Sequence, residues 1–447
     1  MHMRKYACFL FLFLLLLSGC SFSSETLLAL PRTETNAKLL SEQAFDLLSG
    51  RATYEVPDTG DMSGSALDID LNGDGVSETI SCLMKKSGAA SHPCIEIYGY
   101  PDGEPILIAE LEGDGDHIDA LYFPVLDEAG TTGIVVGWGL ADSSLHGMTV
   151  CVFLENQLET LYSGAYQFLS VADMDRDGFD EMVFTANMPG TDGYQALMLD
   201  YIAGDLRVSD AVPLSQGIVL QHVSTANVGF DRVALLCEGY VERYGYVTDV
   251  ILCSASGSLS NIYRTELSGV SEVTARDYPI WCADANNDGI VEFPILREVS
   301  ASFQDHSEKM TLIDWARCEE NAEPTVLYTT YFNMREGWSM RLPDALNRNV
   351  LPVQSIEDDG ISATLFYFLS GEGERGFPLW EIYALSGEQA EENEQALSLQ
   401  RLTVANGTIY AIKVYHLLDG SFYTEDSLQT LFSVLPSVTF TAHAVSN

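Results

Sequence analysis

The chain has 447 residues, and 65 acidic side chains against 22 basic ones give a formal net charge of −43. Hydrophobic residues make up 47% of the sequence, so this acidity belongs to a chain that can bury a core and not to a disordered acidic tail. Nucleic-acid binding is disfavoured, because contact with phosphates needs a basic face. The length predicts two or three domains of about 150 residues each.

The N-terminus is typical of an export signal. Arg4 and Lys5 precede an apolar run from Tyr6 to Leu17, which is too short to span a bilayer comfortably. The ending Leu-Ser-Gly-Cys20 resembles the bacterial lipobox. The resemblance implies cleavage before Cys20, a diacylglycerol on its sulfur, and anchoring to the outer face of the bacterial cell membrane. The alternative is an ordinary secretory signal with a chance cysteine.

Residues 21–54 follow as a Ser/Thr-rich polar tether and a short helix over Asn36–Leu48. Apolar residues recur in this segment at roughly helical spacing. We expect the helix to pack on the domain that follows, the alternative being a position near the membrane.

Three later segments share one spacing of oxygen-bearing side chains, namely Asp70–Glu78, Asp173–Glu181 and Asp284–Glu292. Each has Asp or Asn at positions 1, 3 and 5, glycine at 6 and Glu at 9. Ca²⁺ takes about six to eight oxygen ligands in adaptable geometry, and the glycine permits a sharp turn around them. The predicted ligands are the side chains at positions 1, 3, 5 and 9 and the carbonyl at 7. They are Asp70, Asn72, Asp74, Val76 and Glu78, Asp173, Asp175, Asp177, Phe179 and Glu181, and Asp284, Asn286, Asp288, Ile290 and Glu292.

These loops are not EF-hands, because the Glu at position 12 and the flanking helices are missing. Their flanks are β-like, and they recur at intervals that could each hold two repeats of about 50 residues. Degenerate copies around Asp127 and Asn227 lie midway in the two gaps, with too few oxygens to hold a cation. Four short strands per repeat indicate a blade of a β-propeller.

The sequence therefore predicts a mainly β chain with a five-bladed β-propeller over residues 55–332. Each loop is expected to mark the junction between two blades, so that Ile118–Leu126 would end the first blade. The fifth blade has only three evident strands, and Gly64–Ile69 is expected to complete it and close the ring.

The D-x-[DN]-x-D-G-x-x-E loops resemble the FG-GAP/VCBS repeats of integrin-like propellers and of bacterial surface proteins. The resemblance implies a structural Ca²⁺ at each of the three loops. Glu at position 9 departs from the Asp that is usual in integrins, and its longer arm should still reach the ion. Adhesion, carbohydrate binding and enzyme scaffolding all occur in the wider family, so the fold does not select a function.

Residues 333–447 lack the metal repeat and are predicted to form a separate, small α+β domain. Six strand-like segments, of which Trp338–Leu342 is the first, precede an expected closing helix over Thr424–Val434. The acidic stretch Glu388–Glu394 is predicted to be a solvated loop.

No motif for a serine nucleophile, a zinc protease or a phosphate loop occurs, and the histidines are scattered without metal-ligand spacing. Seven cysteines follow Cys20 without any C-x-x-C pair, and buried free thiols are the expectation, although Cys82–Cys94 and Cys237–Cys253 could bridge strands. Each of the five tryptophans could offer a sugar-stacking face, but burial is expected for each.

Three functional hypotheses follow. The first is a membrane-anchored, calcium-stabilised propeller lipoprotein that binds an extracellular polysaccharide or protein. The second is an extracytoplasmic polysaccharide hydrolase or lyase that uses acidic residues in the propeller channel. The third is a subunit that assists a cell-envelope complex through its C-terminal domain.

Overall fold

A computed structural model describes residues 52–435, except 88–89, 155–156, 188–192, 230–231, 304–305, 319–322, 345, 347–348, 359, 371–373 and 416–424. The predicted signal peptide, the lipidation site Cys20, and the helix expected over Asn36–Leu48 lie outside the described residues. Within the described part of the chain, no helix is both long enough and apolar enough to cross a membrane.

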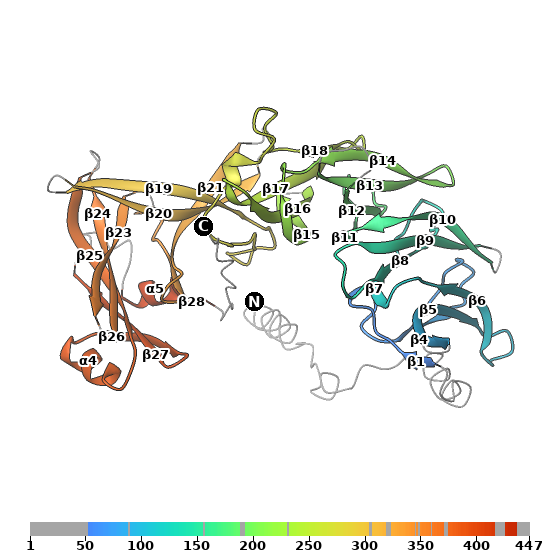
Figure 1. Ribbon diagram of the computed structural model, residues 1–447, viewed down its shortest axis with the longest axis horizontal. Coiled ribbons are helices and arrows are strands. Elements are labelled where there is room, and N and C mark those ends of the chain that lie inside the picture. Colours follow the sequence, from blue (N-terminus) through green and yellow to red (C-terminus); the bar gives the residue numbers. More distant parts are fainter. Residues whose placement is uncertain are drawn as a thin grey trace, which may run out of the picture. The chain divides into compact units, whose positions relative to one another are not determined.

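The described chain is mainly β, with six sheets of four or five strands that follow one another along the sequence (Figure 1). It divides into two compact units. The first comprises residues up to 123 together with 131–160, and the second comprises 124–130 together with residues from 161 onward.

The first two sheets belong to the first unit, and most of their strands pair antiparallel with a sequence neighbour. Sheet one contains β1 (Ala52–Tyr54), β3 (Ala66–Ile69), β4 (Glu78–Ser87), β5 (Ala90–Gly99) and β6 (Ile106–Glu112). Sheet two contains β2 (Thr59–Gly60), β7 (His117–Tyr122), β8 (Gly133–Gly139), β9 (His146–Leu154) and β10 (Gln157–Tyr166), which ends just beyond the unit boundary. The β-branched and aliphatic residues of both sheets share one core that includes Ile80, Ile95 and Ile134.

The third and fourth sheets open the second unit. Sheet three contains β11 (Phe168–Ala172), β12 (Glu181–Asn187), β13 (Tyr194–Ile202) and β14 (Asp205–Pro213). Sheet four contains β15 (Val219–Gly229), β16 (Arg232–Val241), β17 (Gly245–Cys253) and β18 (Leu259–Asn261), and the 3-10 turn η1 (Glu272–Thr274) follows. Their facing side chains, such as Val183, Met198 and Leu235, form a common core.

The fifth and sixth sheets complete the unit. Sheet five contains β19 (Phe293–Phe303), β20 (His306–Cys318), β21 (Pro324–Asn333), β22 (Trp338–Arg341) and β28 (Phe432–Val434). Sheet six contains β23 (Val350–Asp358), β24 (Ile361–Leu369), β25 (Arg375–Leu385), β26 (Gln400–Ala405) and β27 (Thr408–Val414). Two α-helices are described, α4 (Ala390–Ala396) and α5 (Glu425–Thr430).

The strand expected to close the fifth blade has another partner. Ala66–Ile69 pairs with β4 of sheet one, with Ile69 opposite Glu78. A strand that leads into a short turn pairs with the strand leaving it at little loop-closure cost, whereas a partner far along the chain costs more. The fourth position of sheet five is filled by β22, so the predicted closure by Gly64–Ile69 is wrong.

Two of the three loops lie within sheets and not at junctions between them, which corrects a second expectation for these two. The third loop directly precedes β19, the first strand of sheet five, and so lies between sheets four and five as expected. The first loop joins β3 to β4, and the second joins β11 to β12. The segment predicted to end the first blade, Ile118–Leu126, contributes β7, which pairs with β8 in sheet two. Sheets one to four therefore begin one strand earlier than predicted, whereas sheet five begins directly after the third loop, as predicted.

The C-terminal boundary also differs from the expectation. Trp338–Arg341 and Phe432–Val434 join sheet five, and one core that includes Trp338, Phe366 and Trp380 is shared by sheets five and six. The expected helix over Thr424–Val434 is shorter, since its last residues form β28. The acidic stretch Glu388–Glu394 contributes most of helix α4 instead of a loop.

Candidate functional site

The three oxygen-rich loops are hairpin turns of one geometry. The residue before position 1 pairs with the Glu at position 9 in each, as Ile69 with Glu78, Ala172 with Glu181, and Ala283 with Glu292. Positions 4 and 6 have left-handed backbone in all three loops. These residues are Gly73 and Gly75, Arg176 and Gly178, and Asn287 and Gly289. Glycine at position 6 is thus explained by a φ between 84° and 97°, which other residues adopt only with strain.

Shared hydrogen bonds hold the side chains of each loop in place. The Glu at position 9 accepts the backbone N–H of position 2, at 3.0 Å for Glu78, 2.8 Å for Glu181 and 3.2 Å for Glu292. The Asp at position 1 accepts the N–H of the position 6 glycine, at 2.8, 3.2 and 2.8 Å. Each loop therefore presents its remaining carboxylate oxygens from a hydrogen-bonded turn.

The second loop concentrates negative charge. One oxygen each from Asp173, Asp175 and Glu181 lies within 4.8 Å of the other two. Burial, followed by the charges of Asp175, Asp177 and Asp200, raises the pKa of Glu181 to about 8. The Oδ1 atom of Asp173 is buried and has no hydrogen-bond partner among the described residues. This donor set fits a hard divalent cation, which would neutralise the carboxylates and take the orphaned oxygen as a ligand.

The first loop has the same turn with fewer charges. Burial raises the pKa of Glu78, and the charges of Asp74 and Asp70 raise it further. Within the described residues, no lysine or arginine forms an ion pair with these three carboxylates. The carboxylates of the first loop therefore have no counter-charge from a lysine or arginine among the described residues.

An arginine lies among the carboxylates of the third loop. Arg317 donates from Nε and Nη2 to Glu292 Oε1, at 2.9 and 2.7 Å, and Nη2 also contacts Asp288 Oδ2. The hydrogen bond from Arg317 lowers the pKa of Asp288. A guanidinium thus already supplies positive charge where a cation was expected.

The difference between the loops comes from one position on the neighbouring strand. Ala316 pairs with Phe293, Leu199 with Met182, and Tyr98 with Thr79, each of these partners being position 10 of its loop. The next residue along each of these strands lies beside the position 9 Glu. It is Arg317 at the third loop, Asp200 at the second and Gly99 at the first.

The two degenerate copies are also turns between adjacent strands of one sheet. The β7–β8 connection contains Asp127, whose Oδ1 accepts the N–H of Ala129 at 3.0 Å. Asn227 lies near the end of β15, and its Oδ1 accepts Nη2 of Arg176 from the second loop at 2.8 Å. Their side-chain oxygens therefore serve local hydrogen bonds.

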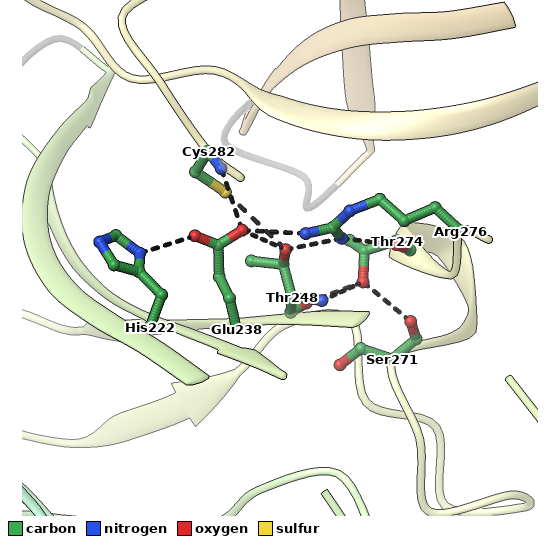
Figure 2. Close-up of polar contacts among 7 residues, drawn as sticks. All are labelled: His222, Glu238, Thr248, Ser271, Thr274, Arg276 and Cys282. Carbon is green, nitrogen blue, oxygen red and sulfur yellow. Dashed lines mark hydrogen bonds and ion pairs between the residues drawn. The ribbon is translucent and has the colours of Figure 1, made fainter. Parts of the chain in front are cut away.

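A buried polar cluster in sheet four was not predicted from the sequence. Glu238 and Arg276 have fully buried side chains and form an ion pair of 3.0 Å. Figure 2 shows His222 and Arg276 on opposite sides of the Glu238 carboxylate. His222 Nδ1 lies 3.0 Å from Glu238 Oε2, while Oε1 accepts the N–H of Cys282 at 2.9 Å and the hydroxyl of Thr248 at 3.1 Å.

The charges in this cluster are mutually stabilised. Burial opposes ionisation of Glu238, but the hydrogen bond from His222 and the charge of Arg276 lower its pKa. The hydrogen bond to Glu238 in turn raises the pKa of His222. No sequence signal marked these residues, because they come from four separate segments with no fixed spacing.

The cysteines and tryptophans largely follow the expectation of burial. All seven described cysteines are free thiols, so neither Cys82–Cys94 nor Cys237–Cys253 is a disulfide. Four tryptophans are buried, namely Trp138, Trp315, Trp338 and Trp380. Trp281 is the exception and remains partly exposed.

No family model matches the sequence, and no curated protein matches it. Solved structures with a partly similar backbone include the exotype rhamnogalacturonan lyase YesX, at 11% identity and a TM-score of 0.30, over 79% of this chain and 61% of that one. They also include Sqt1 from Chaetomium thermophilum, at 12% identity and a TM-score of 0.31, over 68% of each chain. The chain spans about three fifths of the length of the lyase.

Proposed function

We propose that this chain is an exported lipoprotein, anchored to the outer face of the bacterial membrane through Cys20, that binds an extracellular polysaccharide. In this proposal its first five sheets are the blades of a five-bladed β-propeller of the FG-GAP/VCBS type. Their consecutive antiparallel strands, and the recurrence of a turn between neighbouring strands at each predicted position, support it.

Calcium has a structural role in the proposal. The observation that carries it is the second loop, where a buried, unpartnered carboxylate oxygen and a raised Glu181 pKa mark charge that lacks a counter-ion. The first loop has the same turn and is proposed to bind a second ion. At the third loop the guanidinium of Arg317 replaces the ion, which revises the expectation of three sites to two.

The metal proposal is tested with the purified protein by elemental analysis and thermal unfolding. We expect two bound Ca²⁺ per chain and a lower Tm in EGTA, because a ligand that binds only the folded state stabilises it. Asp173→Asn should remove one ion, whereas Asp127→Asn, in a degenerate turn, should remove none. An unchanged Tm in EGTA would refute the structural role.

The anchor and the ligand need separate tests. Cys20→Ala should move the protein from the membrane fraction to the soluble fraction of intact cells, and retention in the membrane would contradict lipidation at this residue. Binding to a panel of soluble polysaccharides tests the ligand class. Measuring product release in the same assays tests the alternative that the protein is a hydrolase or lyase.

A further inference from the structure

Four ring-bearing residues lie together beside the buried Glu238–Arg276 pair, and we call them the aromatic row. They are His222 on β15, Tyr240 on β16, Tyr246 on β17 and Trp281 in the segment after η1. The rings of His222 and Trp281 are 6.1 Å apart and tilted by only 32°. Tyr246 meets Trp281 edge-on at 5.7 Å, and Tyr240 meets Tyr246 edge-on at 5.5 Å.

The aromatic row is accessible to solvent. The side chain of His222 is 47% exposed and Tyr240 is 41% exposed, while Tyr246 and Trp281 are half-buried. The row contains Trp281, the tryptophan that is not buried in a core. Trp and Tyr offer a large apolar face with a polar edge, which suits a ligand that is apolar on one side and polar around its rim.

Glu238 fixes the placement of two members of the row. Its Oε2 accepts from His222 Nδ1, and its Oε1 accepts the backbone N–H of Cys282, the residue next to Trp281. Arg276 neutralises the carboxylate, and backbone hydrogen bonds of 2.8 Å in both directions join Arg276 to Tyr246. One buried charge thus orients the imidazole and anchors the segment that carries the tryptophan (Figure 2).

The same hydrogen bond leaves a directed polar atom at the surface. An ionised carboxylate only accepts, so Nδ1 of His222 must carry the proton that points to Glu238. His222 makes no other hydrogen bond among the described residues, and Nε2 is therefore left for a ligand. An oriented imidazole nitrogen next to aromatic rings supplies both a hydrogen bond and a stacking surface.

We infer that the aromatic row is a binding subsite for one pyranose ring of a neutral polysaccharide, with the apolar C–H face of the sugar on Trp281 and a hydroxyl group on His222 Nε2. This inference rests on the proposed function and names its site and ligand class. Uncharged sugars are favoured over polyanions because the chain carries a net charge of −43. Glu238 acts as a positioning residue that never contacts the sugar.

A role in fold stability alone does not account for the exposed rings beside the buried Glu238–Arg276 pair. Burying an ion pair costs desolvation free energy, and replacing such a pair by apolar residues is often neutral for stability. The buried pair alone would also be complete without a half-exposed imidazole and a partly exposed tryptophan. Its hydrogen bonds lead outward to these two rings, as a support for a surface site would.

The test uses the full-length protein in detergent and measures affinity by calorimetry for soluble neutral glucans, galactans and mannans, with polygalacturonate as the charged comparison. We expect binding to a neutral polymer, a loss of at least tenfold in affinity in Trp281→Ala, and a smaller loss in His222→Gln. Tyr54→Ala is the matched control, because Tyr54 is an exposed tyrosine on β1 outside the row. Each variant is first checked for a cooperative thermal transition well above the temperature of the binding assay, which shows that it is folded.

Glu238→Gln tests the positioning role through a readout that lost stability would not mimic. The ¹⁵N shifts of the His222 ring should report a proton fixed on Nδ1 in the unaltered protein and a mixture of tautomers in the variant. An unchanged tautomer would overturn this role. Should Glu238→Gln fail to fold, a ¹⁵N titration of His222 in the unaltered protein replaces it. The bond to Glu238 should raise the pKa of His222, and a pKa at or below the ordinary value of about 6.5 would overturn the role.

The outcomes separate the site from the proposed function. Neutral polysaccharide binding that survives both Trp281→Ala and His222→Gln would overturn the subsite and leave the proposed function standing. Binding to polygalacturonate alone would overturn the ligand class. Failure of the unaltered protein to bind any polysaccharide would overturn the proposed function, and the subsite with it.

Discussion

Replacing Arg317 should convert the third loop into a calcium site. Arg317→Gln keeps two of the three methylene groups of the stem but removes the positive charge from the carboxylates. The side chain of Glu292 is fully buried, whereas that of Asp288 is 43% exposed. The loss at Glu292 therefore dominates, since exposed ion pairs contribute little to stability.

The size of the effect follows from the bonds removed. Arg317 gives Glu292 two charged hydrogen bonds, at 2.7 and 2.9 Å, and each such bond contributes roughly 1.5 kcal/mol. The pair is partly screened, because the side chain of Arg317 is 20% exposed. We expect Arg317→Gln to lower the free energy of unfolding by about 2–3 kcal/mol in EGTA. Calcium at a hundred times its Kd would restore about 2.7 kcal/mol, which is nearly the whole loss.

Urea denaturation in EGTA and in calcium measures this difference, and calorimetry counts the ions. The number of bound ions should rise from two to three in Arg317→Gln. Arg401→Gln is the control, because Arg401 forms a more exposed pair with Glu394 and should change neither quantity much. Three ions in the unaltered protein, or equal stability of Arg317→Gln with and without calcium, would refute the reasoning.

Three further predictions follow. Asp200→Arg places a guanidinium beside Glu181, at the position that Arg317 has in the third loop, so it should reduce the bound ions from two to one by calorimetry. All seven described thiols should react with Ellman's reagent in denaturant without reductant. Few should react in the folded protein, because burial raises the pKa of Cys82 and Cys94 to about 12. Fewer than seven reactive thiols from these positions in denaturant would reveal a disulfide. The hydrogen bond to Glu238 raises the folded-state pKa of His222. The stabilisation by this pair is therefore complete below the unfolded pKa of about 6.5 and is lost as the pH rises through the folded value. His222→Gln should lower the Tm of the protein more at pH 5.5 than at pH 9, and the reverse order would contradict the ion pair.

The sequence predicted local features of the fold and missed most of the non-local ones. The loops could be found because all their determinants lie within nine residues, where the spacing of Asp, Gly and Glu dictates the turn. The partner of Ala66–Ile69 could not be found in this way, since pairing with β4 or with a distant sheet satisfies the same alternation of side chains. The metal repeat is missing after residue 333, which suggested a domain boundary there. The core around Trp338 and Trp380 nevertheless contains residues from both sides of that boundary.

The candidate sites also contain local features that the sequence predicts and non-local ones that it does not. The hydrogen-bonded turns of the loops follow from the sequence, and metal binding by their side chains stays a prediction. Arg317 was missed because it comes from the next strand, at a distance along the chain that depends on hairpin length and register. The cluster around Glu238 was missed for a stronger reason. Its members His222, Arg276 and Cys282 come from β15 and from the loop after η1, so only the folded backbone brings them together.

The comparison of the three loops indicates what the proposed Ca²⁺ would do in this chain. The same turn forms beside Gly99, Asp200 or Arg317, so the backbone geometry does not depend on a positively charged neighbour. In the proposal, the buried Glu that accepts the N–H of position 2 is neutralised by Arg317 at the third loop and by Ca²⁺ at the other two. A guanidinium supplies this positive charge permanently, whereas Ca²⁺ supplies it only when the ion is available. The stability of sheets one and three should therefore vary with calcium concentration, while that of sheet five should not.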